Sequence, residues 1–240
     1  MLKLFAFSGC YCNPNSTTNF AVEELCRILE KSINQPIEKY FKSAADLKIE
    51  FNPGTGIDFS EGRTAVDDDM KYIEEKILSS SIVVFASPVY LHQVSGTMKN
   101  FIDRIAYWAH LIKLSGKIGI IISVSDSNGN KPVSDYLRQT MEHLGISIVS
   151  NISLKSGVQS REAIKSILRY EATKVKKILL EEQFPISRLQ EDKFRVHKEL
   201  YSKANNNVVI SSERDYWKEQ GMLDFPDFRT FFEHKWYENK

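Results

Sequence analysis

Residues 81–90 read Ser-Ile-Val-Val-Phe-Ala-Ser-Pro-Val-Tyr, and residues 91–105 continue as Leu-His-Gln-Val-Ser-Gly-Thr-Met-Lys-Asn-Phe-Ile-Asp-Arg-Ile. A short apolar run rich in β-branched side chains is typical of a buried parallel strand, expected here over residues 81–86. The Ser-Pro pair predicts the end of that strand, and Ser95 can cap an amphipathic helix whose apolar stripe continues to Ile112. Ligands of open α/β sheets bind beyond the carboxyl ends of strands, so residues 87–92 should face one. An ordinary strand-to-helix connection would have the same spacing.

The same alternation of strands and helices extends over residues 2–182. The expected strands cover residues 2–8, 37–41, 81–86, 119–124 and 146–154, and the expected helices cover residues 19–32, 68–78, 95–112, 132–144 and 161–182. The strand at residues 37–41 includes Glu38 and Lys39, which suggests a position near an edge. Five strands with helices between them predict an α/β fold, a doubly wound five-stranded parallel sheet with right-handed crossovers.

The pattern changes after residue 184. Residues 185–240 contain charged and aromatic side chains without a further strand, with a helix expected at 188–202, a break at 205–207 and an ordered stretch at 215–225. This extension is too aromatic for a solvated linker, so we expect it to pack on the domain of residues 1–184 or on a partner subunit. Tyr107 and Trp108 offer a further candidate subunit contact, although large aromatic residues on helices more often belong to the core.

Composition and charge exclude several classes of protein. The 240 residues have a formal net charge of +1, with 42% hydrophobic and 26% charged residues, so no general field attracts nucleic acid or an anionic membrane. No apolar run approaches the roughly 20 residues that span a bilayer, and no cleavage-type segment follows the first strand, so we expect a cytoplasmic protein. Cys10, Cys12 and Cys26 are too few for a disulfide scaffold.

The loop after the first strand has the composition of an anion site. Ser8 ends the strand, and Ser16, Thr17 and Thr18 lie near the start of the next helix, where free amides and hydroxyl groups can hold a phosphate without a lysine. The glycine spacing of nucleoside triphosphate and dinucleotide loops is absent. A phosphomonoester with a bulky group therefore fits better, although hydroxyl residues at a helix start are also ordinary caps.

Three loops should meet at the carboxyl edge of the sheet, at residues 8–18, 87–92 and 125–130. The first has hydroxyl groups for a phosphate, and the second is stiffened by Pro88 and offers Tyr90 for stacking. The third is polar and contains Ser125, Asn128 and Gly129. This combination predicts a site for flavin mononucleotide (FMN).

Three motifs support this prediction: Ser-Pro-Val-Tyr at residues 87–90, Val-Ser-Gly-Thr-Met-Lys-Asn-Phe-Ile-Asp-Arg at 94–104 and Gly-Arg-Thr-Ala-Val-Asp-Asp-Asp-Met at 62–70. With them, residues 1–154 resemble the flavodoxin-like NADPH-dependent FMN reductase family, in particular its iron–sulfur flavoprotein branch. Residues 215–221 resemble a tail of some members. The resemblance implies NAD(P)H as co-substrate and a homodimer or homotetramer. It also implies that Pro88, Val89 and Tyr90 lie beside the isoalloxazine, and that the phosphate is surrounded by Ser8, Cys10, Ser16, Thr17 and Thr18.

Two departures from the family pattern matter. The first loop reads Gly-Cys-Tyr-Cys at residues 9–12 where the family usually has Gly-Ser-Pro-Arg, so the phosphate contacts are matched less closely than the ring contacts. Residues 54–64 lack the cysteines of iron–sulfur members, and three scattered thiols cannot hold a ferredoxin-like set, so we predict no iron–sulfur cluster. No constellation predicts a metal. Cys10 and Cys12 are either a redox pair or, as we favour, a small residue at the phosphate and an incidental neighbour.

The sequence therefore predicts an FMN-dependent NAD(P)H oxidoreductase that passes hydride or electrons to a small-molecule or protein acceptor. No side chain is assigned as acid, base or nucleophile, because the cofactor performs the chemistry and the protein positions it. His92 is the one histidine near the expected ring, as a substrate contact or as a solvated loop residue. Two alternatives stay open: a flavodoxin-like electron carrier that serves a protein partner, and a cofactor-free binding module.

Overall fold

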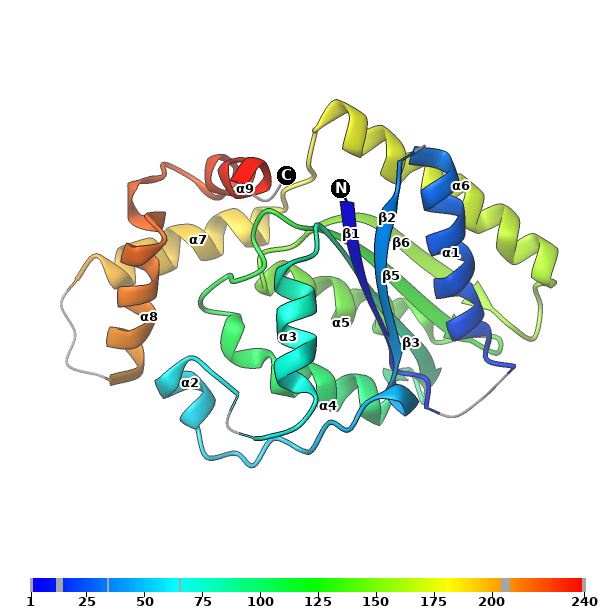
Figure 1. Ribbon diagram of the computed structural model, residues 1–240, viewed down its shortest axis with the longest axis horizontal. Helices are drawn as coiled ribbons and strands as arrows, with labels where there is room; N and C mark the ends of the chain where they lie inside the picture. The colour runs from blue at the N-terminus through cyan, green and yellow to red at the C-terminus, as the bar shows by residue number, and fades with distance from the viewer. Residues whose placement is uncertain (1, 12–14, 34, 65, 204–207, 239–240) are drawn as a thin grey trace.

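A parallel β-sheet runs through the middle of the structure (Figure 1). The computed structural model describes residues 2–11, 15–33, 35–64, 66–203 and 208–238. Five parallel strands lie in the order β2-β1-β3-β5-β6, and a short strand, β4 (Gln93–Val94), pairs antiparallel with the end of β3. The parallel strands are β1 (Leu2–Ser8), β2 (Ile37–Ser43), β3 (Ile82–Tyr90), β5 (Ile118–Ser125) and β6 (Ser147–Lys155). The expected doubly wound sheet is confirmed, with β2 at one edge.

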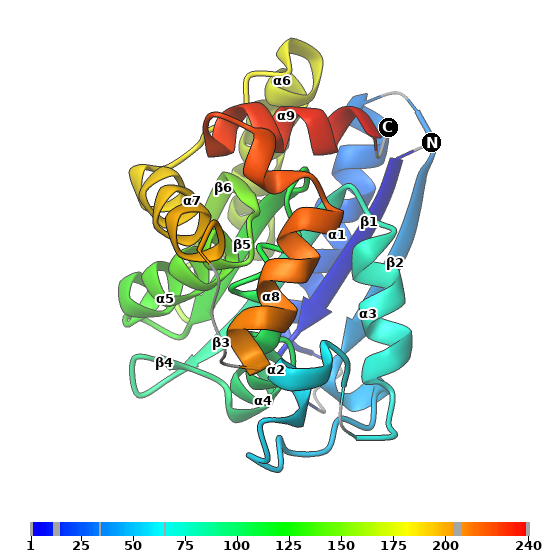
Figure 2. The same ribbon diagram turned by 90° about the vertical axis from the view of Figure 1, so that its left-hand side faces the viewer.

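Helices cover both faces of the sheet, because alternate residues of each strand point to opposite sides. Leu4 and Ala6 of β1 belong to the apolar core beneath α1 (Thr17–Ile33) and α6 (Arg161–Glu181). Phe5 and Phe7 belong to the opposite core, which is covered by α3 (Met70–Leu78), α4 (Gly96–Arg104) and α5 (Asn130–His143) (Figure 2). Burial on both faces explains why the central strands are apolar almost throughout.

In its described residues, 185–203 and 208–238, the C-terminal extension forms three α-helices beside the sheet domain (Figure 1). They are α7 (Arg188–Tyr201), α8 (Val208–Glu219) and α9 (Phe228–Glu238). Their aromatic side chains pack on one another and on the domain: the Phe184 and Trp236 rings lie 4.7 Å apart, and the Trp217 indole donates to the His110 carbonyl at 2.9 Å. The extension therefore packs on its own domain, and a domain boundary between residues 184 and 185 stays a prediction.

Helix α4 is shorter than expected. It ends at Arg104, residues 106–108 form the 3₁₀ turn η2 (Ala106–Trp108), and Ile112 has a φ of 40°. The large apolar side chains of residues 105–112 are too closely spaced to share one helical face, and the irregular backbone buries them. Tyr107 is 2% exposed and Trp108 0%, so these residues belong to the core and the candidate subunit contact is wrong.

The remaining differences are elements that the sequence did not predict. Helices α8 and α9 occupy residues for which only an ordered stretch at 215–225 was expected. A short helix, α2 (Ile57–Glu61), and two 3₁₀ turns, η1 (Ala44–Asp46) and η3 (Met222–Asp224), were not expected as elements. The break expected at residues 205–207 lies outside the described residues. Among the helices that the structure describes, none combines the length and the apolar character that a membrane span requires.

Candidate functional site

The loop after β1 is fixed at its beginning by hydrogen bonds to neighbouring elements. The amide of Gly9 donates to the carbonyl of Ala86 in β3 at 2.8 Å. The carbonyl of Gly9 accepts from the hydroxyl groups of Ser95 (2.7 Å) and Thr97 (2.6 Å) at the start of α4. A side chain on Gly9 would clash there, since its Cβ would lie 2.5 Å from Ser95 Oγ. The first loop is thus held close to the loop after β3.

The predicted phosphate residues have different surroundings. Ser8 is fully buried and its hydroxyl donates to Asn19 Oδ1 at 2.6 Å, while the Cys10 amide donates to Ser8 Oγ at 3.2 Å. The Ser16 hydroxyl accepts from the Asn19 amide at 3.1 Å and so caps α1. Thr17 is half-buried and Thr18 buried in the first turn, where helix geometry leaves amides without intrahelical acceptors. Cys12 lies outside the described residues, so its pairing with Cys10 stays untested.

A guanidinium group that is distant in sequence also contacts this loop. Arg161, the first residue of α6, donates to the carbonyl of Asn15 at 3.1 Å and lies 4.1 Å from the ring centroid of Phe20. It adds positive charge beside the amides that begin α1, which favours an anion. The sequence analysis missed Arg161, because its position depends on the packing of α6 against α1 and no local pattern signals it.

The segment at residues 87–94 is a hairpin, not a break between strand and helix. β3 continues to Tyr90, with Pro88 opposite Val124 of β5, and turns into β4. The pairing of β3 with β1 ends at Ala86, so a proline that lacks an N–H group is tolerated beyond that point. The expected strand end at residue 86 is therefore wrong.

The turn of this hairpin has an unfavourable backbone. Leu91 and His92 have φ values of 47° and 62°, in the left-handed region that a two-residue turn of this class requires and that Asn-Gly adopts most readily. Leu91 is 98% exposed and Tyr90 62% exposed. Neither side chain is buried by its own chain, which leaves the Tyr90 ring open to a planar ligand.

The loop after β5 contacts the hairpin. The side chains of His92 and Asn128 pair through Nε2 and Oδ1 at 3.1 Å. Gly129 has a φ of 89°, and a Cβ there would lie 2.7 Å from Cδ2 of His92 and 2.9 Å from Cγ1 of Val89. The hydroxyl of Ser125 is buried and donates to Asn130 Oδ1 at 2.5 Å.

Asn130 is a second residue that the sequence analysis missed. Its amide group donates to the carbonyls of Ser123 (2.9 Å) and Leu154 (3.0 Å), which anchors the third loop to two strands. The three predicted loops thus lie side by side at the carboxyl ends of β1, β3 and β5. This place is the switch point of the sheet, since β2 lies to one side of β1 and the later strands lie to the other.

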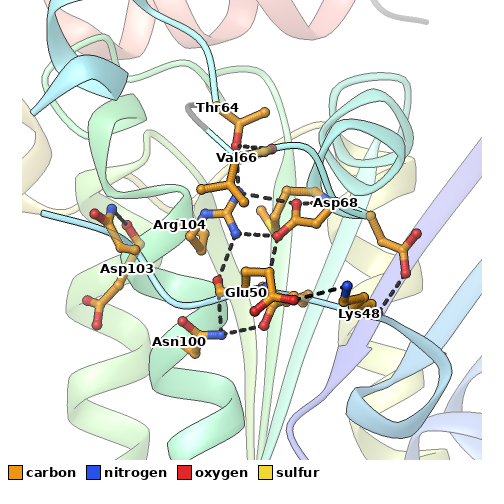
Figure 3. A network of polar contacts seen from close by, with 12 residues as sticks. Lys48, Glu50, Thr64, Val66, Asp68, Asn100, Asp103 and Arg104 are labelled. Atoms are coloured by element: carbon orange, nitrogen blue, oxygen red, sulfur yellow. Dashed lines mark hydrogen bonds and ion pairs between the residues drawn. The ribbon is translucent and has the colours of Figure 1, made fainter. Parts of the chain in front are cut away.

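A long connection is here called the strap (residues 47–64 and 66–69). Its first residues line one pocket together with Tyr11 of the first loop, and the strap is held by α4 (Figure 3). Arg104 donates to the carboxylate of Asp68, to the Glu50 carbonyl at 2.8 Å and to the Thr64 hydroxyl at 2.6 Å. Asn100 donates to the carbonyl of Ile49 at 3.0 Å. Burial alone would raise the pKa of Asp68, but hydrogen bonds from Arg104 and backbone amides outweigh it and hold that pKa below its usual value.

These observations can be compared with known proteins. A sequence profile described as NADPH-dependent FMN reductase matches residues 2–159. The chain belongs to this family. The matched residues of this NADPH-dependent FMN reductase family contain all the strands of the sheet, from β1 to β6, and the resemblance stated from the sequence is confirmed.

Two archaeal relatives carry the name iron-sulfur flavoprotein. The protein from Archaeoglobus fulgidus is 27% identical over 217 residues, which cover 89% of this chain and 94% of the relative. The protein from Methanocaldococcus jannaschii is 31% identical over 133 residues, which cover 54% of this chain and 66% of the relative. This FMN reductase family member is therefore similar to the first archaeal protein over most of both chains, and to the second over about half of its own length.

Solved structures show the same fold. RosB with bound 8-demethyl-8-formylriboflavin-5'-phosphate has a TM-score of 0.61 and 14% identity, covering 86% of this chain and 89% of RosB. An FMN-dependent NADH-azoreductase from Bacillus anthracis in complex with FMN has a TM-score of 0.52 and 12% identity, covering 75% of this chain and 99% of the azoreductase. At these identities the likeness concerns the flavodoxin-like fold alone.

The residues at the switch point fit FMN. The first amides of α1, with Arg161 beside them, are groups that can donate to a phosphate. The exposed ring of Tyr90 and the half-buried Pro88 and Val89 offer an apolar surface for a flat ring system. Polar groups at one end and apolar groups at the other match a phosphorylated ring.

Proposed function

We propose that this protein is an FMN-dependent oxidoreductase that takes a hydride from NADH or NADPH and passes electrons to a small-molecule or protein acceptor. One observation carries the proposal: the start of α1, whose first amides lack intrahelical acceptors, and a partly exposed hairpin both lie at the switch point of a flavodoxin-like sheet. Membership of the FMN reductase family supports it.

Each predicted site residue has a role in this proposal. The amides and hydroxyl groups of Thr17 and Thr18 bind the phosphate, with Arg161 as a nearby cation. Pro88, Val89 and Tyr90 lie against the ring. Residues whose polar groups are already engaged shape the loops around the ligand: Ser8, Cys10, Ser16, Ser125 and Asn128. Gly129 leaves the space that His92 and Val89 occupy beside it.

The division of work between protein and cofactor follows from these roles. Bound FMN would supply the two-electron chemistry. The protein binds the phosphate, orients the ring and limits the access of water. No residue needs to act as an acid, a base or a nucleophile, so the site can be built mainly from backbone groups and small polar side chains.

We also infer that this protein carries no iron–sulfur cluster, although two archaeal relatives are named iron-sulfur flavoproteins. The sequence has three cysteines, and residues 54–64 contain none. A cluster is normally held by several thiolates. Determination of iron and acid-labile sulfide in protein purified without oxygen tests this inference, and stoichiometric iron and sulfide would contradict it.

The central experiment combines an absorption spectrum with anaerobic stopped-flow mixing. We expect a flavin spectrum after purification or after addition of FMN, and rapid bleaching of the flavin by NADH or NADPH. A flavin that is bound but is bleached only by a protein partner would identify an electron carrier. Failure to bind FMN at all would identify a cofactor-free module.

A further inference from the structure

One side chain joins the two loops that are proposed to hold the ring. His92 extends from the β3–β4 hairpin, and its Nε2 lies 3.1 Å from Oδ1 of Asn128 in the loop after β5. The same imidazole lies over Gly129, where a Cβ would come within 2.7 Å of its Cδ2. The contact between hairpin and loop therefore depends on an imidazole at residue 92 and on the absence of a side chain at residue 129.

His92 makes this contact from a strained backbone. Its φ of 62° lies in the left-handed region, at the second position of a two-residue turn where glycine is favoured. Leu91, at the first position, has a φ of 47° and leaves its side chain in solvent. Both residues of the turn are therefore of types that rarely adopt this left-handed backbone. Backbone strain of this kind is concentrated at binding sites, where a side chain is needed in a fixed place.

We propose that His92 is a positioning residue whose hydrogen bond with Asn128 sets the separation of the two turns that hold the flavin ring. This inference rests on the proposed function, because it places the ring between those turns. A hairpin that is already fixed relative to the opposite loop loses less conformational freedom when a ring binds, so the bond strengthens binding without touching the phosphate. The imidazole donates through Nε2 both when protonated and as the Nε2–H tautomer, so the contact does not require a charge.

A matched pair of substitutions tests the role of this bond. In His92→Gln the side-chain amide can occupy the position of Nε2 and donate to Asn128, whereas in His92→Asn the shorter amide cannot reach it. Asparagine tolerates the left-handed backbone at least as well as histidine. We expect His92→Gln to bind FMN within about twofold of the unsubstituted protein, and His92→Asn to bind about three- to tenfold more weakly, the range of one hydrogen bond.

Binding is measured with the unsubstituted apoprotein and both variants, by quenching of flavin fluorescence and by the release rate of FMN from the holoprotein. Riboflavin, which lacks the phosphate, should show the same loss in His92→Asn as FMN. Urea unfolding of the apoproteins should show His92→Asn to be as stable as the unsubstituted protein. A merely structural contact would instead lower stability along with affinity.

The outcomes separate the two proposals. If the unsubstituted protein binds neither FMN nor riboflavin, the proposed function is overturned. If it binds FMN and His92→Asn binds equally well, or if His92→Asn loses stability and affinity together, the role of His92 is overturned and the proposed function stands. A loss that His92→Gln restores, at unchanged stability, supports the role of His92.

Discussion

Arg104 and Asp68 form an ion pair in which neither side chain has any exposed surface. The two residues come from α4 and from the end of the strap, and the guanidinium also reaches Glu50 and Thr64 (Figure 3). A charged group that is buried away from solvent is tolerated in a protein only when it is paired and hydrogen-bonded. This pair is therefore the main anchor of a connection that has little regular structure of its own.

Substitution of Arg104 by methionine should lower the free energy of unfolding by about 3–5 kcal/mol, because it leaves the Asp68 carboxylate buried without its partner. Urea unfolding followed by circular dichroism measures the change. A second substitution, Asp68→Leu, in the Arg104→Met background should recover part of the loss, since no charge then stays buried. Loss of the same size in the double variant would contradict this account.

Lys99 offers a matched control on the same helix. It pairs with Asp103, and the two side chains are 50% and 43% exposed. Exposed pairs of this kind contribute little, so Lys99→Met should change stability by no more than about 0.5 kcal/mol. An effect of Lys99→Met as large as that of Arg104→Met would mean that charge on α4, not the burial of the pair, determines the loss.

Leu91 should be replaceable with a gain in stability. Its side chain is 98% exposed and its φ is 47°, so it loses little contact when replaced and its backbone is strained. Leu91→Asn should raise the free energy of unfolding by about 0.5–1 kcal/mol, because asparagine suits the first position of this turn. Leu180→Asn is the control: Leu180 is 72% exposed but lies in α6, where asparagine is a poorer helix former. A gain in the free energy of unfolding at both positions would mean that the loss of an exposed apolar side chain, and not the geometry of the turn, is responsible.

The sheet could be predicted from sequence because its signal is local. Strands buried on both faces are apolar almost throughout, and strands that alternate with helices form a parallel sheet with right-handed crossovers, although the order of the strands was not predicted. The hairpin at residues 87–94 was missed because Leu91-His92 has none of the chemistry that marks a two-residue turn. The sequence placed Asp68 only at the start of an expected helix, yet its partner is 36 residues away in sequence. The convergence of three loops at the carboxyl edge of the sheet was predictable, whereas Arg161 reaches the first loop only through tertiary packing.

Gly129→Ala should weaken the binding of FMN. A Cβ at residue 129 would lie 2.7 Å from His92 Cδ2 and 2.9 Å from Val89 Cγ1, so the hairpin would have to move away from the loop after β5. We expect affinity for FMN to fall by about tenfold or more, since a small displacement of a preformed site removes several contacts. Fluorescence titration measures the affinity. Gly221→Ala is matched in backbone strain, with a φ of 64° and no atom near its added Cβ, and should leave FMN affinity unchanged.

His197 should make stability depend on pH. Its ring lies 5.2 Å from that of His110 and 6.0 Å from that of Trp217, and burial lowers its pKa from the ordinary value of 6.5. As the pH falls, the imidazole therefore binds a proton in the unfolded chain before it does so in the folded chain. The contribution of neutral His197 to the free energy of unfolding is present above pH 6.5, and it is lost as the pH falls through 6.5 toward the lower pKa of the folded state. His197→Gln should flatten the slope of unfolding free energy against pH in that range. His143 is shifted in the same direction, so some slope should stay, and an unchanged slope would contradict the assignment.

Arg161 allows the phosphate end of the site to be tested separately from the ring. Its guanidinium donates to the carbonyl of Asn15, beside the amides that begin α1, and it is the one cation that the described structure shows bonded to this loop. Arg161→Met should weaken FMN binding by about three- to tenfold, and this loss should shrink at high salt because a partly exposed charge is screened. Riboflavin has no phosphate, so its affinity should not change. Arg169→Met, two turns further along α6, removes the same charge away from the loop and should affect neither ligand. Equal losses for FMN and riboflavin in Arg161→Met would show that Arg161 shapes the loop and does not act on the phosphate.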